Sequence, residues 1–331
     1  VRRFDSCFQK HAPIVHGMIC GTMAVAFVTH PDCLKHEMGA WHPERPERLT
    51  AIEDQLIASG VGQYLQRHDA PLATDEQLAR VHPPEYVRAI RDAAPQEGTV
   101  HLDPDTAMNP YSLQAAMRAA GAAVHATDLV LSDAAEAAFC SVRPPGHHAC
   151  RARPMGFCIF NNVAVAARHA LDAHGLERVA IIDFDVHHGN GTEDIFAHDP
   201  CVLMASTFQH PFYPYSGTED PAPNMVNVPL PAGAGSKQFR AAVSKAWLPA
   251  LEGFRPQLLI ISAGFDAHAE DDMAMLSFTD QDYAWVTQQM KAVADRHAGG
   301  RVVSLLEGGY ALSALGRSVV QHLRVLAGLD A

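Results

Sequence analysis

The sequence lacks the features that would place the protein in a membrane, on nucleic acid or outside the cell. No run of about 18 or more apolar residues occurs, so no ordinary membrane-spanning helix is expected. The net charge of −12 argues against a nucleic-acid binder, which needs a basic face to neutralise phosphates. The seven cysteines include no C-x-x-C pair, which disfavours both a structural zinc ribbon and a disulfide framework. We therefore expect a cytoplasmic protein in a reducing compartment.

The chain also lacks internal repeats, low-complexity blocks and Gly/Ser linkers that would divide it into domains. Apolar residues make up 48% of it and charged residues 19%, a balance typical of a globular protein with a sizeable core. Residues 1–22 are interpreted as an N-terminal extension or leader, because Met23 directly precedes the first β-rich run. We expect a single domain over residues 23–331.

What the chain does have is a regular alternation of short β-rich runs and longer helical patterns. Several runs are nearly continuous apolar segments, as expected for strands buried on both faces of a sheet. The alternation predicts an α/β fold, a three-layer α/β/α domain with a mostly parallel central sheet. The β-rich runs are Ala24–Thr29, Ala137–Val142, Arg178–Asp183, Cys201–Ser206, Gln257–Ser262 and Arg301–Leu306. The helical patterns are Pro46–Ser59, Ser112–Leu131, Asn162–His174, Ser236–Glu252, Asp280–His297 and Leu312–Leu329.

Chemically reactive motifs follow four of the predicted strands. They are "RPPGHH" from Arg143, "DVHHG" from Asp185, "AGFD" ending at Asp266, and "EGGY" ending at Tyr310. Ligands of open α/β sheets bind beyond the carboxyl ends of the strands. We therefore expect these motifs to meet at one edge of the sheet.

The motif D-x-D-x-H is the strongest signal of a metal site. In extended backbone Asp183, Asp185 and His187 share one side, so that all three can serve a metal or one can support the other two. Asp266 supplies a further carboxylate from another strand. Two carboxylates and one imidazole leave a coordination position open for water, as in catalytic zinc sites, and Fe(II) or Mn(II) suits the same donors. The alternative is a helix-capping carboxylate with surface histidines.

The remaining motifs supply groups that move protons and stabilise charge. His147 and His148 follow a stiff Pro-Pro-Gly turn, and an imidazole beside a metal can act as general base and acid. Tyr310 follows two glycines, and its phenol could donate to the oxygen of a tetrahedral intermediate. Loop histidines and a packed core tyrosine are the alternative interpretation.

The ordered motifs "RPPGHHA", "MGFCIFNN", "DFDVHHGNGT", "SAGFDAH" and "EGGY", between Arg143 and Tyr310, resemble those of the histone deacetylase family, within the arginase/deacetylase fold. "HPERPERL", from His42 to Leu49, resembles an early loop of that family. Asn190 in "HHGNGT" resembles the class II branch and its bacterial relatives, the histone deacetylase-like and acetylpolyamine amidohydrolases.

The resemblance implies a role for each reactive side chain. It implies zinc on Asp185, His187 and Asp266. It pairs His147 with Asp183 and His148 with Asn190, with His148 as the main general base and acid and His147 mainly electrostatic. It makes Tyr310 the oxyanion donor. It also implies a structural potassium ion on backbone and side-chain oxygens around Asp183, Asp185, His187 and Ser206.

The resemblance also implies a narrow tunnel for an acyl-lysine side chain. Gly156 and Phe157 would line it, with an aromatic from Phe212–Tyr213 opposite, although "QHPFYPYSG" departs from the family's usual Phe-Phe-Pro. Met273 takes the position of a glutamate gate in polyamine-selective relatives, which disfavours a dedicated acetylpolyamine enzyme. The acidic run Glu270–Asp272 could still attract a cationic amine.

These interpretations predict a zinc-dependent amidohydrolase that removes acyl groups, acetyl foremost, from acylated lysine or a related primary amine. The alternatives are an acetylpolyamine amidohydrolase, an arginase-like binuclear ureohydrolase and a catalytically silent acyl-lysine-binding protein. A tandem His-His motif and Asn190 speak against the ureohydrolase, which needs further metal carboxylates. Bacterial members of the family often form homo-oligomers, and the sequence shows no interface by which to judge this chain.

Overall fold

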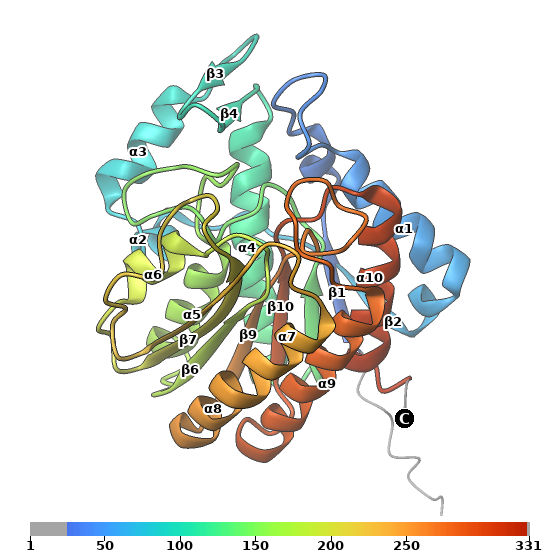
Figure 1. Cartoon of the computed structure of the whole chain (residues 1–331). Helices are drawn as coiled ribbons and strands as arrows, with labels where there is room; N and C mark the ends of the chain where they lie inside the picture. Colours follow the sequence, from blue (N-terminus) through green and yellow to red (C-terminus); the bar gives the residue numbers. More distant parts are fainter. Residues whose placement is uncertain (1–24, 330–331) are drawn as a thin grey trace, which may run out of the picture.

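An eight-stranded sheet forms the centre of the computed structural model, which describes residues 25–329 (Figure 1). The strand order is β2-β1-β5-β10-β9-β6-β7-β8, and every neighbouring pair is parallel. The strands are β1 (Val25–Thr29), β2 (Leu65–Asp69), β5 (Ala137–Cys140), β6 (Val179–Asp183), β7 (Val202–Gln209), β8 (Met225–Leu230), β9 (Leu258–Ala263) and β10 (Val302–Leu306). A short antiparallel hairpin, β3 (Val100–His101) with β4 (Ala107–Met108), lies outside the sheet.

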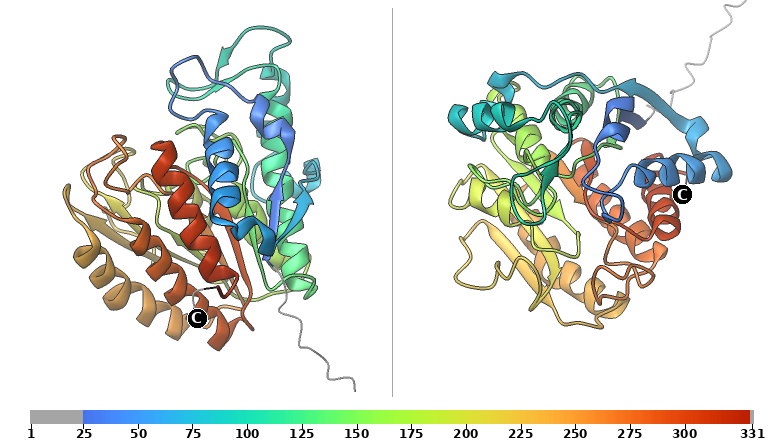
Figure 2. Two further views of the ribbon diagram at one scale, coloured as in Figure 1. Left: turned by 90° about the vertical axis from the view of Figure 1, so that its right-hand side faces the viewer. Right: turned by 90° about the horizontal axis from the view of Figure 1, so that it is seen from above.

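Helices cover both faces of the sheet (Figure 2). On one face α4 packs against α5, and on the other α1, α10, α9 and α8 pack in series. The helices are α1 (Glu47–Ser59), α2 (Asp75–Ala79), α3 (Pro84–Ala93), α4 (Ser112–Leu131), α5 (Asn162–Asp172), α6 (Asn190–Phe196), α7 (Ser236–Ala242), α8 (Leu248–Phe254), α9 (Asp280–His297) and α10 (Leu312–Leu326). This confirms the predicted three-layer α/β/α architecture.

The central strands β5, β10, β9, β6 and β7 are buried along their whole length, which explains their continuous apolar sequences. The two edge strands, β2 and β8, were not predicted from the sequence. Much of each strand is at least partly exposed, so neither carries a continuous apolar run. Their pairing partners, and not their own residues, identify them as strands.

The predicted helix Ser236–Glu252 is the clearest difference between expectation and structure. It divides into α7, a π-helical turn over Val243–Trp247, and α8, with Pro249 in the first turn of α8. A proline there cannot donate its backbone N–H to the preceding turn, so regular α-helical bonding is interrupted before it. Three short helices, α2, α3 and α6, were not predicted, because each is brief and flanked by loop residues.

The predicted extension over residues 1–22 lies outside the described residues, as do Met23 and Ala24, so this interpretation stays a prediction. The five cysteines between residues 25 and 329 are all free thiols. No helix in that part of the chain is long and apolar enough to cross a membrane.

Candidate active site

The four reactive motifs meet at the carboxyl ends of the strands, as predicted. β6 lies next to β9, with Asp183 beside Ser262, and β9 lies next to β10. The segments that follow these strands therefore carry Asp185, His187 and Asp266 to one place. A parallel sheet with sequentially distant neighbours makes this convergence possible, because every strand ends at the same edge.

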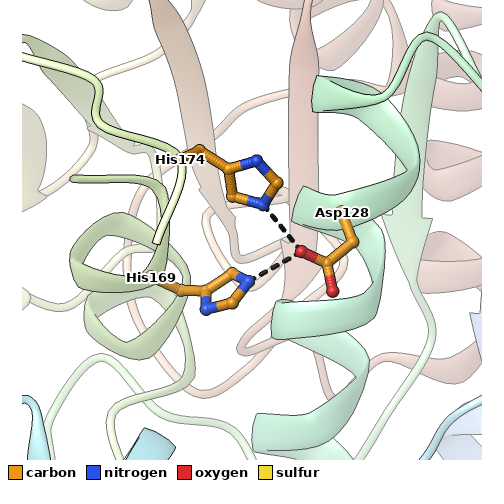
Figure 3. Close-up of side chains that lie close together, drawn as sticks. All are labelled: Asp128, His169 and His174. Atoms are coloured by element: carbon orange, nitrogen blue, oxygen red, sulfur yellow. Dashed lines mark hydrogen bonds and ion pairs between the residues drawn. The ribbon is translucent and has the colours of Figure 1, made fainter. Parts of the chain in front are cut away.

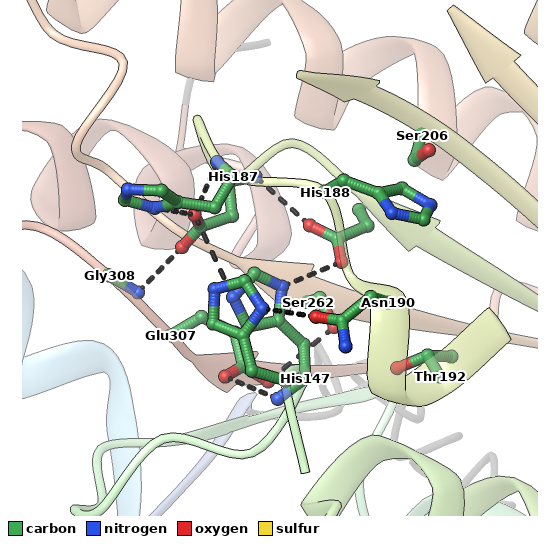
Figure 4. Close-up of polar contacts among 12 residues, drawn as sticks. His147, His187, His188, Asn190, Thr192, Ser206, Ser262, Glu307 and Gly308 are labelled. Atoms are coloured by element: carbon green, nitrogen blue, oxygen red, sulfur yellow. Dashed lines mark hydrogen bonds and ion pairs between the residues drawn. The ribbon is translucent and has the colours of Figure 1, made fainter. Parts of the chain in front are cut away.

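Asp185, His187 and Asp266 form a buried cluster whose ligand atoms all lie within 4.8 Å of one another. Nδ1 of His187 is 3.0 Å from Oδ1 of Asp185 and 3.3 Å from Oδ2 of Asp266. The other oxygen of each carboxylate is fixed by a backbone amide. Oδ2 of Asp185 accepts from Gly308 N at 2.8 Å (Figure 4). Oδ1 of Asp266 accepts from Val186 N at 2.9 Å.

Two observations show that this cluster fits a cation. Oδ2 of Asp266 is buried and accepts no hydrogen bond from the described residues, although buried oxygens are normally satisfied. Gly308 leaves room for both carboxylates, because a Cβ on it would lie 2.0 Å from Oδ2 of Asp266 and 2.6 Å from Oδ2 of Asp185. Any larger residue would displace the two oxygens.

The pKa values of the cluster also indicate that it favours a positive charge. Burial and the neighbouring charge of Asp185 raise the pKa of Asp266 to about 6. Burial alone would lower the pKa of His187, but its hydrogen bond to Asp185 and the neighbouring carboxylate of Asp266 raise that pKa to about 9. Two buried carboxylates therefore require a positive charge between them, and without a metal ion a proton supplies it.

The two histidines of the "GHH" motif have opposite proton affinities. Nδ1 of His147 lies 2.9 Å from Oδ2 of Asp183, and Nδ1 of His148 lies 2.7 Å from Oδ1 of Asn190. Burial would lower the pKa of His147, but the charges of Asp185 and Asp183 raise it well above its usual value. Burial and the positive neighbours His147 and His187 lower the pKa of His148 well below its usual value.

A cavity of about 170 Å³ opens beside the cluster and the histidine pair. Its walls include every residue predicted for the acyl-lysine tunnel, and both aromatic candidates contribute. The lining residues are Asp105, Pro145, His147, His148, Gly156, Phe157, His187, Phe212, Tyr213, Met273, Gly308 and Tyr310. Gly156 has φ +57°, and a Cβ there would meet Cδ2 of His148 at 2.3 Å, so this wall position requires glycine.

Two acidic residues at this site, Asp105 and Glu307, were given no role from the sequence. Asp105 lines the cavity and accepts from Gly156 N at 2.9 Å. Glu307 is fully buried, and its Oε2 accepts from Gly146 N at 2.7 Å and His147 N at 3.1 Å. Only the folded chain identifies these roles, since the sequence does not show which distant backbone amides a carboxylate will bind.

The sequence suggested that Asp271 could help to attract a cationic amine, but the structure gives its carboxylate another role. Asp271 is buried, and its Oδ2 accepts from Tyr310 N at 2.6 Å and Ala311 N at 2.9 Å. Its carboxylate is therefore committed to holding the Tyr310 loop. Glu270 is paired with Arg317 at 2.6 Å, and Asp272 is exposed.

The potassium ion stays a prediction, and two of the residues proposed to surround it lie side by side. Ser206 on β7 lies beside Asp183 in the sheet register. His188, the next residue along the chain, points away from His187 (Figure 4). Its Nε2 pairs with Glu193 at 2.7 Å.

Comparison with known proteins agrees with this geometry. The family model of the histone deacetylase domain matches residues 42–326 of the sequence. The chain is 40% identical over 295 residues to a histone deacetylase-like amidohydrolase of Pseudomonas aeruginosa, covering 85% of this chain and 77% of that protein. It is 37% identical over 333 residues to the polyamine deacetylase HDAC10 of Homo sapiens, covering 92% of this chain and 48% of that protein. The crystal structure of the HDA15 HD domain matches with a TM-score of 0.87 at 37% identity, covering 93% of this chain and 89% of that one. The chain therefore belongs to the histone deacetylase family of hydrolases and has the arginase/deacetylase fold.

Proposed function

We propose that this chain is a zinc-dependent amidohydrolase that removes acyl groups, acetyl foremost, from acylated lysine or a related primary amine. The observation that carries the proposal is the buried cluster of Asp185, His187 and Asp266 beside two histidines of opposite proton affinity. Two carboxylates and one imidazole suit a catalytic zinc ion, and Fe2+ accepts the same donors. The names of the relatives, amidohydrolase and deacetylase, support this reaction class.

Asp185, His187 and Asp266 would hold the ion. When bound there, zinc polarises a carbonyl and lowers the pKa of a water molecule. The protein's own contribution is rigid placement, since backbone amides of Gly308 and Val186 orient the two carboxylates. We also propose the potassium ion near Asp183 and Ser206 as a structural support beneath this cluster.

His148 would move the proton of the reaction. Its lowered pKa keeps the ring neutral, and the Asn190 carbonyl oxygen at 2.7 Å holds the ring proton on Nδ1. Nε2 is then free to take a proton from water and return it to the departing amine. His147, with its raised pKa and its bond to Asp183, would keep a positive charge beside the reacting atoms.

Tyr310 would stabilise the oxyanion. It lines the cavity, and Arg48 lies 4.9 Å from the centre of its ring. Its phenol would donate to the carbonyl oxygen as negative charge develops there. Asp271 would fix the backbone that carries it, because it accepts hydrogen bonds from the amides of Tyr310 and Ala311.

The cavity walls favour an acyl-lysine side chain over an acetylated polyamine. Phe157 and Tyr213 offer flat apolar surfaces for an alkyl chain. Met273 contributes no charge that could pair with the second ammonium group of a polyamine. The similarity to a polyamine deacetylase keeps that substrate as the competing outcome.

The test is a substrate panel on chain stripped of metal and reloaded with Zn2+ or Fe2+. We expect hydrolysis of acetyl-lysine peptides only after reloading, with acetylspermidine a poorer substrate. Met273→Glu should shift the ratio of the two activities toward acetylspermidine. Preference of the wild type for acetylspermidine would indicate a polyamine enzyme, and zinc-loaded chain that binds acetyl-lysine without hydrolysis would contradict the proposed activity.

A further inference from the structure

A second group of metal-binding side chains lies at the end of the molecule opposite the cavity. Asp128 stands in the last turn of α4, His169 in the last turn of α5, and His174 just beyond α5. Each helix leads into a strand of the parallel sheet, α4 into β5 and α5 into β6. Their carboxyl ends therefore lie at the edge where the strands begin, away from the candidate active site.

The two imidazoles of this group both contact one carboxylate oxygen of Asp128. Nε2 of His169 and Nε2 of His174 each lie 2.7 Å from Oδ1 of Asp128 (Figure 3). One ligand atom from each residue lies within 4.8 Å of the others. The side chain of His169 is buried, whereas that of His174 is 29% exposed and that of Asp128 48% exposed, so the cluster is open to ions from solution.

We propose that Asp128, His169 and His174 form a second site for a divalent transition-metal ion such as Zn2+, with water completing its shell. Two imidazoles and a carboxylate are ordinary ligands of zinc and of its neighbours Co2+, Ni2+ and Cu2+. The carboxyl ends of α4 and α5 add partial negative charge, which favours a cation. The ion would link α4 to α5 and stabilise their packing without touching the cavity.

Arg80 opposes metal binding through its hydrogen bond to His169. Without metal, both Nε2–H groups donate to Asp128, and Nδ1 of His169, 2.6 Å from NH1 of Arg80, accepts from the guanidinium. An ion on Nε2 of His169 requires the ring proton on Nδ1, where it would face the guanidinium of Arg80. Arg80 must then turn toward Glu76, whose Oε1 is 3.5 Å from its NH2. The site therefore binds metal more weakly than its ligands alone would allow.

The experiment is equilibrium dialysis of the full chain against Zn2+, with the bound metal counted per chain. His174→Ala and Asp128→Ala should each bind one equivalent less than the wild type. Arg80→Ala should bind that equivalent at least about tenfold more tightly, as expected for removal of an opposing neighbour of a ligand. His125→Ala is the matched control. It removes a histidine from the same helix that faces His68 and leaves the three ligands in place, so its zinc count should equal that of the wild type.

The two metal centres are separable in the same measurement. Asp266→Ala tests the proposed catalytic centre and should still bind the zinc ion of the second site. The anomalous scattering of zinc in crystals can locate that ion. His174→Ala and Asp128→Ala chains that bind as much zinc as the wild type, at the same affinity, would overturn the second site. Arg80→Ala chain that binds no more tightly would contradict the competition.

Discussion

The molecule contains two clusters of histidine and aspartate built from the same residue types on opposite edges of one sheet. In the cluster of Asp185, His187 and Asp266, no side chain is more than about a tenth exposed, and each carboxylate is anchored by a backbone amide. In the cluster of Asp128, His169 and His174, a half-exposed carboxylate serves both imidazoles through a single oxygen. Burial and anchoring, and not residue type, separate the two.

The difference determines what each cluster needs. Two carboxylates in the interior repel each other, so the buried cluster requires a positive charge and is incomplete without one. The surface cluster is satisfied by hydrogen bonds among its own side chains and Arg80. The first is therefore suited to hold an ion permanently, and the second to exchange one with solution.

The largest effect is expected from Asp266→Ala in the buried cluster. Loss of this ligand removes the metal and leaves Asp185 and His187 without their partner. Loss of an oxyanion donor costs about 10²–10³-fold in turnover, and we expect the loss of hydrolysis here to be larger. Turnover and bound zinc should be measured together. Asp128→Ala is the surface counterpart and should keep wild-type turnover. Asp266→Ala chain that retains both zinc and activity would remove this residue from the centre.

Tyr310→Phe should lower kcat by about 10²–10³-fold with little change in KM, because the phenol acts on the transition state and not on the bound substrate. Zinc content should be unchanged, which distinguishes this variant from a ligand loss. Wild-type turnover would exclude Tyr310 from the mechanism.

Asp271→Ala should have a smaller effect of the same kind. The loop of Tyr310 loses the acceptor of two backbone amides, and a misplaced catalytic group can cost up to about 10²-fold. The double variant Asp271→Ala/Tyr310→Phe should be little slower than Tyr310→Phe alone, since both changes act through one phenol. Fully additive losses would show that Asp271 acts on something else.

Glu307→Gln tests the buried region through stability. Burial raises the pKa of Glu307 to about 7 from its usual 4.5, so the folded chain holds this proton more tightly than the unfolded chain. The free energy of unfolding therefore falls as pH rises through this window, and the glutamine variant should lose that part of the slope. Urea unfolding at about pH 5 and about pH 8 measures it. Equal slopes in the two proteins would contradict the shift.

The smallest effect is expected from Asp128→Asn at the surface. Half-exposed ion pairs contribute about 0–1 kcal/mol, so the free energy of unfolding without zinc should change by no more than this. Thermal unfolding with and without Zn2+ would sharpen the comparison, because only the wild type should gain stability from a zinc ion bound at the surface cluster. Equal gains in both proteins would favour the buried cluster as the source.

The fold and the reactive residues could be predicted from the sequence to different depths. The central strands and α4 and α9 are recognisable, because long apolar runs and helical periodicity are local signals. The edge strand β2 is not, because its sequence LQRHD shows neither signal. The reactive side chains were recognisable because they lie in motifs that follow strands. The roles of Asp105, Asp271 and Glu307 were not, because they depend on hydrogen bonds from amides far away in the chain.

The amino-acid order alone determined where the central strands and the long helices form and which motif follows each of these strands, because apolar patterning and turn residues act over short distances. Only the tertiary structure decided which distant strands lie side by side, and therefore which carboxylates share a buried imidazole. The same step made Asp271 an internal acceptor and not a surface charge. Solvation and long-range pairing set these outcomes, and neither is encoded in the spacing of residues along the chain.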